Sequence, residues 1–392
     1  MREGNVLSCY TPGFGGVGEA VMKMAFGNGF GFCFNTDVPL SELFGYQYGS
    51  FVIETKEELE DAMFLGTVTE EKTFSYGEEQ IPADELLGIY ENKLEGVYSC
   101  NIPAAEGPAE NLTFEAASWP SPAVKTARPK VLIPAFPGTN CEYDSAKAVA
   151  DAGAEPEILV INNLSSAGIT ASVDKFAESL KTAQMIFIPG GFSGGDEPDG
   201  SGKFITAFFR NGKIKDGGTE LLVQREGLMC GICNGFQALI KLGLVPYGKI
   251  IDTDENCPTL TFNTIARHQS RIVRTRIASN KSPWLSLMKP GDIVNVPISH
   301  GEGRFIASDE LIRQLAENGQ IATQYVDMDG NASMDVHFNP NGSMYAIEGI
   351  TSPDGRVFGK MGHSERIGEG LYKNVPGNYD IRMFEAAVKY FR

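Results

Sequence analysis

Two cysteines lie close together in the segment Leu228–Gln237, which reads LMCGICNGFQ. Cys230 and Cys233 form a CxxC, a spacing typical of a redox-active pair or of half a zinc site. The same residues contain a G-x-C-x-G, from Gly231 to Gly235, which is the nucleophile-elbow pattern with sulfur in place of the serine oxygen. The first interpretation predicts redox or metal chemistry, and the second predicts covalent catalysis by a thiolate.

The position of the cysteines favours the elbow. A redox CxxC normally opens a helix, whereas Cys230 lies inside an apolar run, Leu228–Cys233, that is typical of a buried strand. Because side chains alternate along a strand, Cys230 and Cys233 should point to opposite faces. A zinc site needs a second ligand pair, and the sequence has no other CxxC and no HxxxH. We therefore expect Cys233 to be a nucleophile at a helix N-terminus, where the helix dipole favours the thiolate.

A thiolate nucleophile requires a histidine to move protons and a third group to orient that histidine. The sequence has four histidines, and two of them precede a carboxylate at i+2: His300 with Glu302, and His363 with Glu365. His363 follows an apolar-alternating stretch, Arg356–Met361, and lies in a polar turn, where catalytic groups are common. We predict His363 and Glu365 as the catalytic pair, and His300 stays a second candidate.

A glycine-rich loop, Pro189–Asp196, follows another apolar run that is predicted to be a buried strand. Glycines there allow backbone amides to point at a ligand, so the N–H groups of Gly191 and Asn234 are predicted to form an oxyanion hole. An ordinary glycine-rich turn is the alternative for this loop.

The bulk composition limits the possible functions. The chain has 392 residues, 42% of them hydrophobic, which is enough for two domains. Fifty acidic and 33 basic residues give a net charge of −17, which argues against nucleic acid and anionic membranes as partners. Seven scattered cysteines indicate a reducing compartment. No signal peptide and no apolar run of about 18 residues is visible, so we expect a cytoplasmic protein.

Residues 101–127 are rich in turn-forming residues and are predicted to be a linker. After the linker, strands and helices alternate, which predicts a doubly wound parallel sheet. The expected strands are Val131–Phe136, Glu157–Ile161, Met185–Ile188 and Leu228–Cys233, and the main expected helices are Cys141–Ala152, Val173–Thr182, Phe204–Arg210, Gly235–Leu242 and Tyr379–Tyr390.

The first region contains a phosphate-binding pattern. Gly13–Gly18 matches GxGxxG between a predicted strand, Asn5–Tyr10, and a predicted helix, Glu19–Phe26, and Asp37 stands where a ribose-binding acid belongs. The following stretch, Leu43–Val52, does not continue a βαβ series. Glycines also serve tight turns in which two backbone segments approach closely, and we favour that interpretation over a dinucleotide site.

Five motifs occur together and in order, and the set resembles the class I glutamine amidotransferase domain of the phosphoribosylformylglycinamidine synthase family over residues 128–392. The resemblance implies a flavodoxin-like sheet and a glutaminase in which Cys233 attacks the glutamine amide and His363, oriented by Glu365, transfers protons. It also implies that Gln237 holds the substrate and that His300 lies near it. The motifs are FPGTNC (Phe136–Cys141), PGGFS (Pro189–Ser193), GICNGFQ (Gly231–Gln237), HGEGR (His300–Arg304) and HSER (His363–Arg366).

Residues 1–100 resemble the end of the synthetase region of the same family, an α+β domain similar to the C-terminal part of aminoimidazole ribonucleotide synthetase. The segments Thr11–Gly18 and Leu43–Gly49 carry this resemblance. It implies no cofactor in this chain, ATP and Mg²⁺ in the full enzyme, and three partners: glutamine, formylglycinamide ribonucleotide and the missing synthetase portion. A free-standing cysteine hydrolase of the same superfamily and an inactive docking module remain as alternatives.

Overall fold

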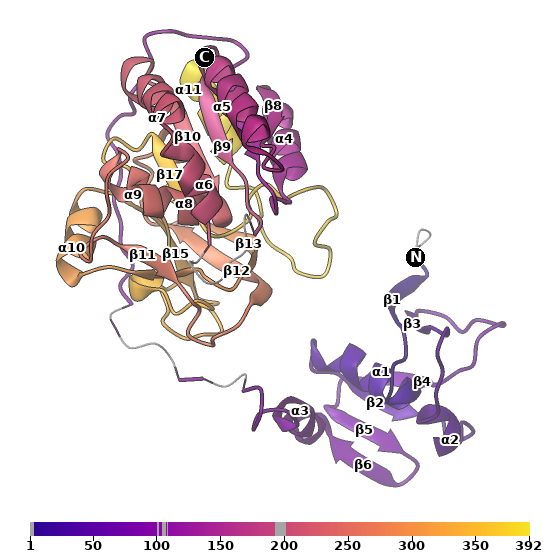
Figure 1. Ribbon diagram of the computed structural model, residues 1–392. Coiled ribbons are helices and arrows are strands. Elements are labelled where there is room, and N and C mark those ends of the chain that lie inside the picture. Colours follow the sequence, from indigo (N-terminus) through magenta and orange to yellow (C-terminus); the bar gives the residue numbers. More distant parts are fainter. Residues whose placement is uncertain (1–3, 100–101, 104–106, 108, 193–200) are drawn as a thin grey trace. The chain divides into compact units, whose positions relative to one another are not determined.

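The structure is a computed structural model that describes residues 4–99, 102–103, 107, 109–192 and 201–392. It divides into two compact units, Met1–Asn101 and Ile102–Arg392, both drawn in Figure 1. In the described parts of the chain, every helix is too short or too polar to span a bilayer.

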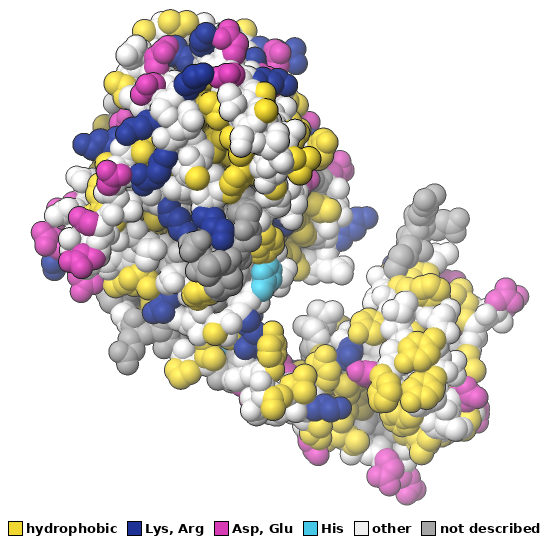
Figure 2. Space-filling model, viewed as in Figure 1, with side chains coloured by type: hydrophobic (Ala, Val, Ile, Leu, Met, Phe, Trp, Pro, Cys, Tyr) yellow, Lys and Arg dark blue, Asp and Glu magenta, His cyan; other side chains and the backbone are white. Residues whose placement is uncertain are grey.

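The smaller unit is an α+β domain. It has one four-stranded sheet in the order β4-β2-β5-β6, and β1 pairs with β3 in a separate two-stranded sheet. Its core lies between α1 and the larger sheet and includes Val17, Val21, Phe32 and Phe74. Figure 2 shows many hydrophobic side chains on the face of this unit that is in view. The elements are β1 (Val6–Tyr10), α1 (Gly16–Phe26), β2 (Gly31–Phe34), α2 (Leu40–Leu43), β3 (Val52–Thr55), β4 (Gly66–Thr69), β5 (Thr73–Tyr76), β6 (Glu79–Pro82) and α3 (Ala83–Asn92).

The GxGxxG turn of this unit is a close-packing turn. The strands on either side of it, β1 and β2, belong to different sheets, whereas a dinucleotide site needs this turn between adjacent parallel strands. Gly16 has a φ of +68°, and a Cβ there would lie 2.7 Å from the carbonyl oxygens of Leu43 and Gly45. The close approach of two backbone segments therefore explains the glycine, as the sequence analysis favoured.

The larger unit is built on one nine-stranded mixed sheet in the order β13-β12-β15-β16-β17-β10-β9-β7-β8. The five strands from β8 to β17 are parallel. Numbered along the chain and read from β8, they lie in the order 2-1-3-4-5, which is the flavodoxin-like arrangement. The first elements are β7 (Lys130–Ala135), α4 (Glu142–Asp151), β8 (Glu155–Val160), α5 (Ser166–Leu180), β9 (Met185–Ile188), α6 (Lys203–Phe209), α7 (Gly212–Thr219), η1 (Glu220–Gln224), β10 (Leu228–Ile232), α8 (Asn234–Leu242) and α9 (Leu244–Tyr247).

Four antiparallel strands extend the parallel sheet, with β16 pairing against β17. The sequence predicts no strand for residues 258–355. The remaining elements are β11 (Thr259–Thr261), β12 (Gln269–Ile277), η2 (Pro283–Leu285), β13 (Ile293–His300), β14 (Arg304–Ile306), α10 (Asp309–Glu317), β15 (Ile321–Val326), η3 (Met344–Ala346), β16 (Ile347–Thr351), β17 (Val357–Lys360) and α11 (Met383–Phe391).

Helices cover both faces of the parallel strands (Figure 1). On one face, α11 brings Phe384 against Phe187 of β9, and Trp284 of η2 contacts the same ring. On the other face, Phe176 of α5 packs edge-on against Phe208 of α6, and α6 packs against α8. The predicted doubly wound sheet is therefore confirmed.

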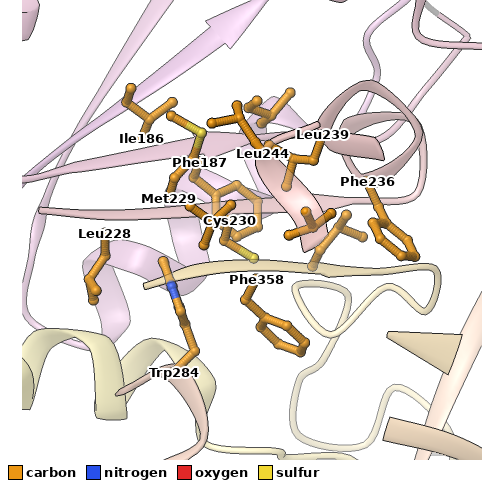
Figure 3. Close-up of a cluster of buried hydrophobic side chains, with 14 of the residues drawn as sticks. Ile186, Phe187, Leu228, Met229, Cys230, Phe236, Leu239, Leu244, Trp284 and Phe358 are labelled. Carbon is orange, nitrogen blue, oxygen red and sulfur yellow. The ribbon is translucent and has the colours of Figure 1, made fainter. Parts of the chain in front are cut away.

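The core around β10 is apolar, and Cys230 lies inside it. Figure 3 shows this cysteine among Phe187, Met229, Trp284 and Phe358, all of which are at most 1% exposed. Burial of such side chains contributes about 1.5–3 kcal/mol each, and this apolar packing fixes the strand ends on which the site is built.

The segment before β7, predicted as a linker over residues 101–127, makes contacts with the larger unit in its described part. The backbone N–H of Phe114 donates to Ala278 at 2.8 Å, and the indole N–H of Trp119 donates to Asn280 at 2.6 Å. The backbone N–H of Thr126 donates to Phe391 of α11 at 2.9 Å. These hydrogen bonds tie residues 114–126 to the surface of the larger unit.

Candidate active site

Cys233 lies at a sharp strand-to-helix turn between β10 and α8. Its backbone angles are φ 54° and ψ −109°, which is a strained conformation for a residue with a side chain. Two glycines make the turn possible: a Cβ at Gly231 would lie 2.6 Å from the backbone of Gly235, and a Cβ at Gly235 would lie 2.1 Å from the carbonyl oxygen of Ile188. The geometry is that of a nucleophile elbow.

The two cysteines of the CxxC do not form a pair. Cys230 and Cys233 are both free thiols. Cys230 is completely buried in the core, and burial raises the pKa of its thiol well above the ordinary value, which disfavours the reactive thiolate. Cys233 instead caps the N-terminus of α8, where its Sγ lies 3.8 Å from the carbonyl oxygen of Ser299.

His363 follows β17 and lies in a turn that is completely buried. Its Nδ1 lies 2.6 Å from Oε1 of Glu365, and its Nε2 has no protein partner within the described residues. Burial opposes the charged ring, but the Glu365 carboxylate and the Cys233 sulfur outweigh it, so the pKa of His363 lies well above its ordinary value. Burial also acts on Glu365, but the imidazolium outweighs it and keeps the pKa of that carboxyl lowered.

Gly190 lies where His363, Cys233 and Cys141 come close together. A Cβ at Gly190 would lie 2.7 Å from Cε1 of His363, 3.2 Å from Cβ of Cys233 and 3.3 Å from Sγ of Cys141. Three parallel strands end here: Gly190 follows β9, Cys233 follows β10 and His363 follows β17. Ligands bind at this carboxyl edge of a parallel sheet. The fold therefore brings the thiol of Cys233 and the His363–Glu365 pair together at a place that suits ligand binding.

The predicted oxyanion donors lie at the same edge. Gly191 has a φ of +136°, and a Cβ there would lie 2.5 Å from the carbonyl oxygen of Gly138. The loop is tied down because the N–H of Phe192 donates to Gly138 at 2.8 Å. Asn234 is the first residue of α8, so its N–H points out of the helix N-terminus. The rest of the predicted loop, residues 193–196, lies outside the described residues.

His300 ends β13 and is 2% exposed. Both of its ring nitrogens lack a partner in the described part of the protein. Burial lowers the pKa of His300 from 6.5 to about 3, with smaller contributions from His363 and His268. The carbonyl oxygen of the neighbouring Ser299 lies 3.8 Å from Cys233 Sγ, so the end of β13 lies beside the predicted nucleophile.

The larger unit matches a known protein-family model. Residues 128–391 match the model of the CobB/CobQ-like glutamine amidotransferase domain. The chain belongs to this family.

The chain is also similar to proteins of Methanococcus maripaludis. The chain is 38% identical over 255 residues to "Phosphoribosylformylglycinamidine synthase subunit PurQ" of Methanococcus maripaludis strain C7, covering 65% of this chain and 87% of the relative. It is 39% identical over 255 residues to the protein of the same name from strain S2, with coverage of 65% and 87%. Among solved structures, "Structure of PurLQS from Thermotoga maritima" has 26% identity and a TM-score of 0.49, covering 68% of this chain and 100% of that chain.

The amidotransferase site also contains Cys141 and Arg366, two motif residues for which the sequence predicts no role. Cys141 is completely buried, and its Sγ lies 3.9 Å from Nδ1 of His363. The guanidinium of Arg366 donates to that sulfur at 2.8 Å. Their presence in the motifs FPGTNC and HSER was the available signal, but nothing in the sequence places residues 225 positions apart in contact.

Three side chains at this site are close enough to be tested as metal ligands. One ligand atom each from Cys141, His363 and Glu365 lies within 4.8 Å of the others. The positive guanidinium of Arg366 already contacts the sulfur, and His363 Nδ1 bonds directly to the Glu365 carboxylate. A cation would have to displace both interactions, so the arrangement of these residues favours an ion-pair network over a metal site.

The side-chain amide of Gln237 is hydrogen-bonded at both ends, and its role in holding glutamine stays a prediction. Its side-chain Oε1 accepts from the amide of Asn234 at 3.0 Å, and its Nε2 donates to the carbonyl oxygen of Glu302. The carboxylate of Glu302 in turn accepts from the backbone N–H of Ser201 at 2.8 Å. Both ends of the Gln237 amide are therefore engaged within the protein, and it connects α8 to the segment that follows His300.

Proposed function

We propose that the larger unit is the glutaminase portion of phosphoribosylformylglycinamidine synthase. In this role it releases ammonia from glutamine, and the ammonia converts formylglycinamide ribonucleotide to formylglycinamidine ribonucleotide in purine biosynthesis. The observation that carries the proposal is the convergence of Cys233 at the elbow with His363 and Glu365 in a member of the amidotransferase family. The name of the two archaeal relatives supports the choice of pathway.

The first half of the reaction forms a thioester. The Cys233 thiolate attacks the side-chain carbonyl carbon of glutamine, and a C–S bond forms as the C–N bond breaks. The raised pKa of His363 supports an imidazolium beside the thiolate, and this imidazolium gives its proton to the departing ammonia. The backbone amides of Gly191 and Asn234 hold the negative oxygen, and losing one such donor costs about 3–4 kcal/mol.

The second half of the reaction hydrolyses the thioester. His363, now neutral, takes a proton from water, and the resulting hydroxide attacks the thioester carbonyl. The C–S bond breaks, glutamate leaves and the thiolate returns. Glu365 stays charged and holds the ring by the 2.6 Å contact, because its own pKa is lowered.

The smaller unit is part of the same proposal. We assign residues 1–100 to a partial synthetase domain that joins a synthetase portion on the same or another chain. Its exposed aromatic side chains support this assignment, because monomeric proteins rarely leave such surfaces uncovered. ATP, Mg²⁺ and the ribonucleotide would bind to the synthetase portion, and the cytoplasmic location stays a prediction. The most exposed of these side chains are Phe14, Phe44, Tyr46, Tyr48 and Phe51.

Glutamine hydrolysis by two cysteine variants tests the proposal. We expect Cys233→Ala to abolish glutamate release, while Cys230→Ala keeps most of the activity because Cys230 is completely buried in the core. A free-standing cysteine hydrolase would need no glutamine, and an inactive docking module would give no glutamate in any variant. Equal loss of activity in the two variants would contradict the elbow assignment.

A further inference from the structure

A buried ion pair lies next to the turn that carries His363. Lys360 ends β17 and Glu348 lies on the neighbouring β16, and both side chains are 0% exposed. Lys360 Nζ and Glu348 Oε1 are 3.2 Å apart. Charged residues are almost never buried unless they are paired, and a buried pair gains little net stability because both charges lose their hydration. A contribution to stability therefore does not explain well why this ion pair is present.

The pair is attached to the turn that carries His363. Lys360 Nζ donates to the carbonyl oxygen of Gly362 and to the hydroxyl of Ser364, both at 3.0 Å. Glu348 accepts the backbone N–H of Gly362 at 2.6 Å. The peptide groups on both sides of Gly362 are thus fixed, as is the residue that follows His363.

The same lysine also touches the nucleophile. The backbone N–H of Cys233 donates to the carbonyl oxygen of Lys360 at 2.9 Å. Lys360 therefore bonds through its backbone to the elbow and through its side chain to the histidine turn. Thr323 of β15 donates its hydroxyl to the remaining oxygen of Glu348, which fixes that carboxylate in turn.

We infer that the Lys360–Glu348 pair is a positioning device that holds the His363 turn in register with Cys233. The inference rests on the proposed glutaminase function. In the described part of the protein, no hydrogen bond or ion pair joins the side chain of Lys360 or Glu348 to the sulfur of Cys233 or the imidazole of His363, so both act through the turn. Positions of reacting groups matter because a misplacement of about 1 Å can cost about 10²-fold in rate.

The test is a charge-neutral double variant of the full chain, Lys360→Met with Glu348→Gln. Removing both charges avoids leaving one buried charge unpaired. We expect kcat for glutamine hydrolysis to fall by about 10²-fold while KM changes little, because substrate contacts are retained. The rate of Cys233 alkylation by iodoacetamide, followed by peptide mass spectrometry, should fall as well, and this readout does not depend on turnover.

The matched control is a second ion pair at the other end of β17. Arg356 and Asp354 are 2.7 Å apart, and the double variant Arg356→Met with Asp354→Asn should lower the melting temperature while leaving kcat and alkylation as in the parent. If the Lys360 double variant does not fold, Ser364→Ala removes one of the lysine's acceptors and should lower kcat without changing KM.

Two results would overturn the inference. One is a folded Lys360→Met, Glu348→Gln variant with the parent's kcat and alkylation rate, and the other is a folded Ser364→Ala variant with the parent's kcat. Failure of the proposed function looks different: the parent chain would release no glutamate, and its Cys233 would be alkylated no faster than in His363→Ala.

Discussion

Substitution of Gly190 by alanine tests the geometry of the site with a single added methyl group. The backbone at Gly190 does not require a positive φ, so alanine fits the chain itself. The new Cβ would lie 2.7 Å from Cε1 of His363 and 3.2 Å from Cβ of Cys233. Since carbon atoms pack at about 3.5–4.0 Å, the imidazole must move by about 1 Å.

A shift of this size should reduce glutaminase kcat by about 10²-fold, which corresponds to about 2.7 kcal/mol of lost transition-state stabilisation. The added methyl group should also cost about 1–3 kcal/mol of folding stability through overpacking. The assay is glutamate release under saturating glutamine, together with thermal unfolding of the same preparation.

Gly218→Ala is the matched control. Gly218 is a buried glycine of α7, and a Cβ there would meet nothing within 4 Å. Alanine in a helix is favoured over glycine by about 1 kcal/mol, so this variant should be at least as stable as the parent and fully active. Parental kcat in a folded Gly190→Ala variant would refute the claim that Gly190 provides the space in which His363 meets Cys233.

Three further outcomes are expected. His363→Ala should lower glutaminase kcat by about 10² or more, whereas His300→Ala should mainly raise KM; the opposite pattern would reverse the two assignments. Because folding lowers the pKa of His300 from 6.5 to about 3, the unfolded chain binds more protons between these values, and this residue makes stability rise with pH there. Its slope is at most about 1.4 kcal/mol per pH unit, and denaturant unfolding of His300→Asn should show a smaller slope than the parent; an unchanged slope would contradict the burial argument. Finally, the chain alone should make no formylglycinamidine ribonucleotide from the formylglycinamide ribonucleotide, ATP, Mg²⁺ and ammonia, and product detected by mass spectrometry would mean that the synthetase site had been misplaced.

The sequence predicted the elements whose signals are local. An apolar run, a cysteine between two glycines and a helical pattern describe β10, Cys233 and α8 within 15 residues, so the elbow was readable before the fold. The boundaries were less exact: the last helix was expected from Tyr379 and begins at Met383. Side chains of Asn378 and Asp380 accept backbone N–H groups two residues on, which holds this stretch in turns before the helix starts.

Several features that depend on distant contacts were not predicted. The sequence gives no sign that Arg366 reaches the sulfur of Cys141, because the two residues meet only when β7 and β17 end at the same edge of the sheet. The buried position of Lys360 was not predicted either, because lysine ordinarily lies on the surface. Its partner, Glu348, lies on an antiparallel strand that was also not predicted. Gln237 lies on α8 as predicted, and the hydrogen bonds of its amide to Asn234 and to the backbone at Glu302 were not predicted.

The covalent intermediate is the most direct test of the glutaminase assignment. The full chain is mixed with glutamine, quenched in acid within the first turnovers and digested, and the peptides are analysed by mass spectrometry. We expect a γ-glutamyl adduct on the peptide that contains Cys233, located on that residue by fragmentation and lost in Cys233→Ala. An adduct on Cys141 or Cys230, or glutamate release in Cys233→Ala at the parental rate, would contradict the assignment.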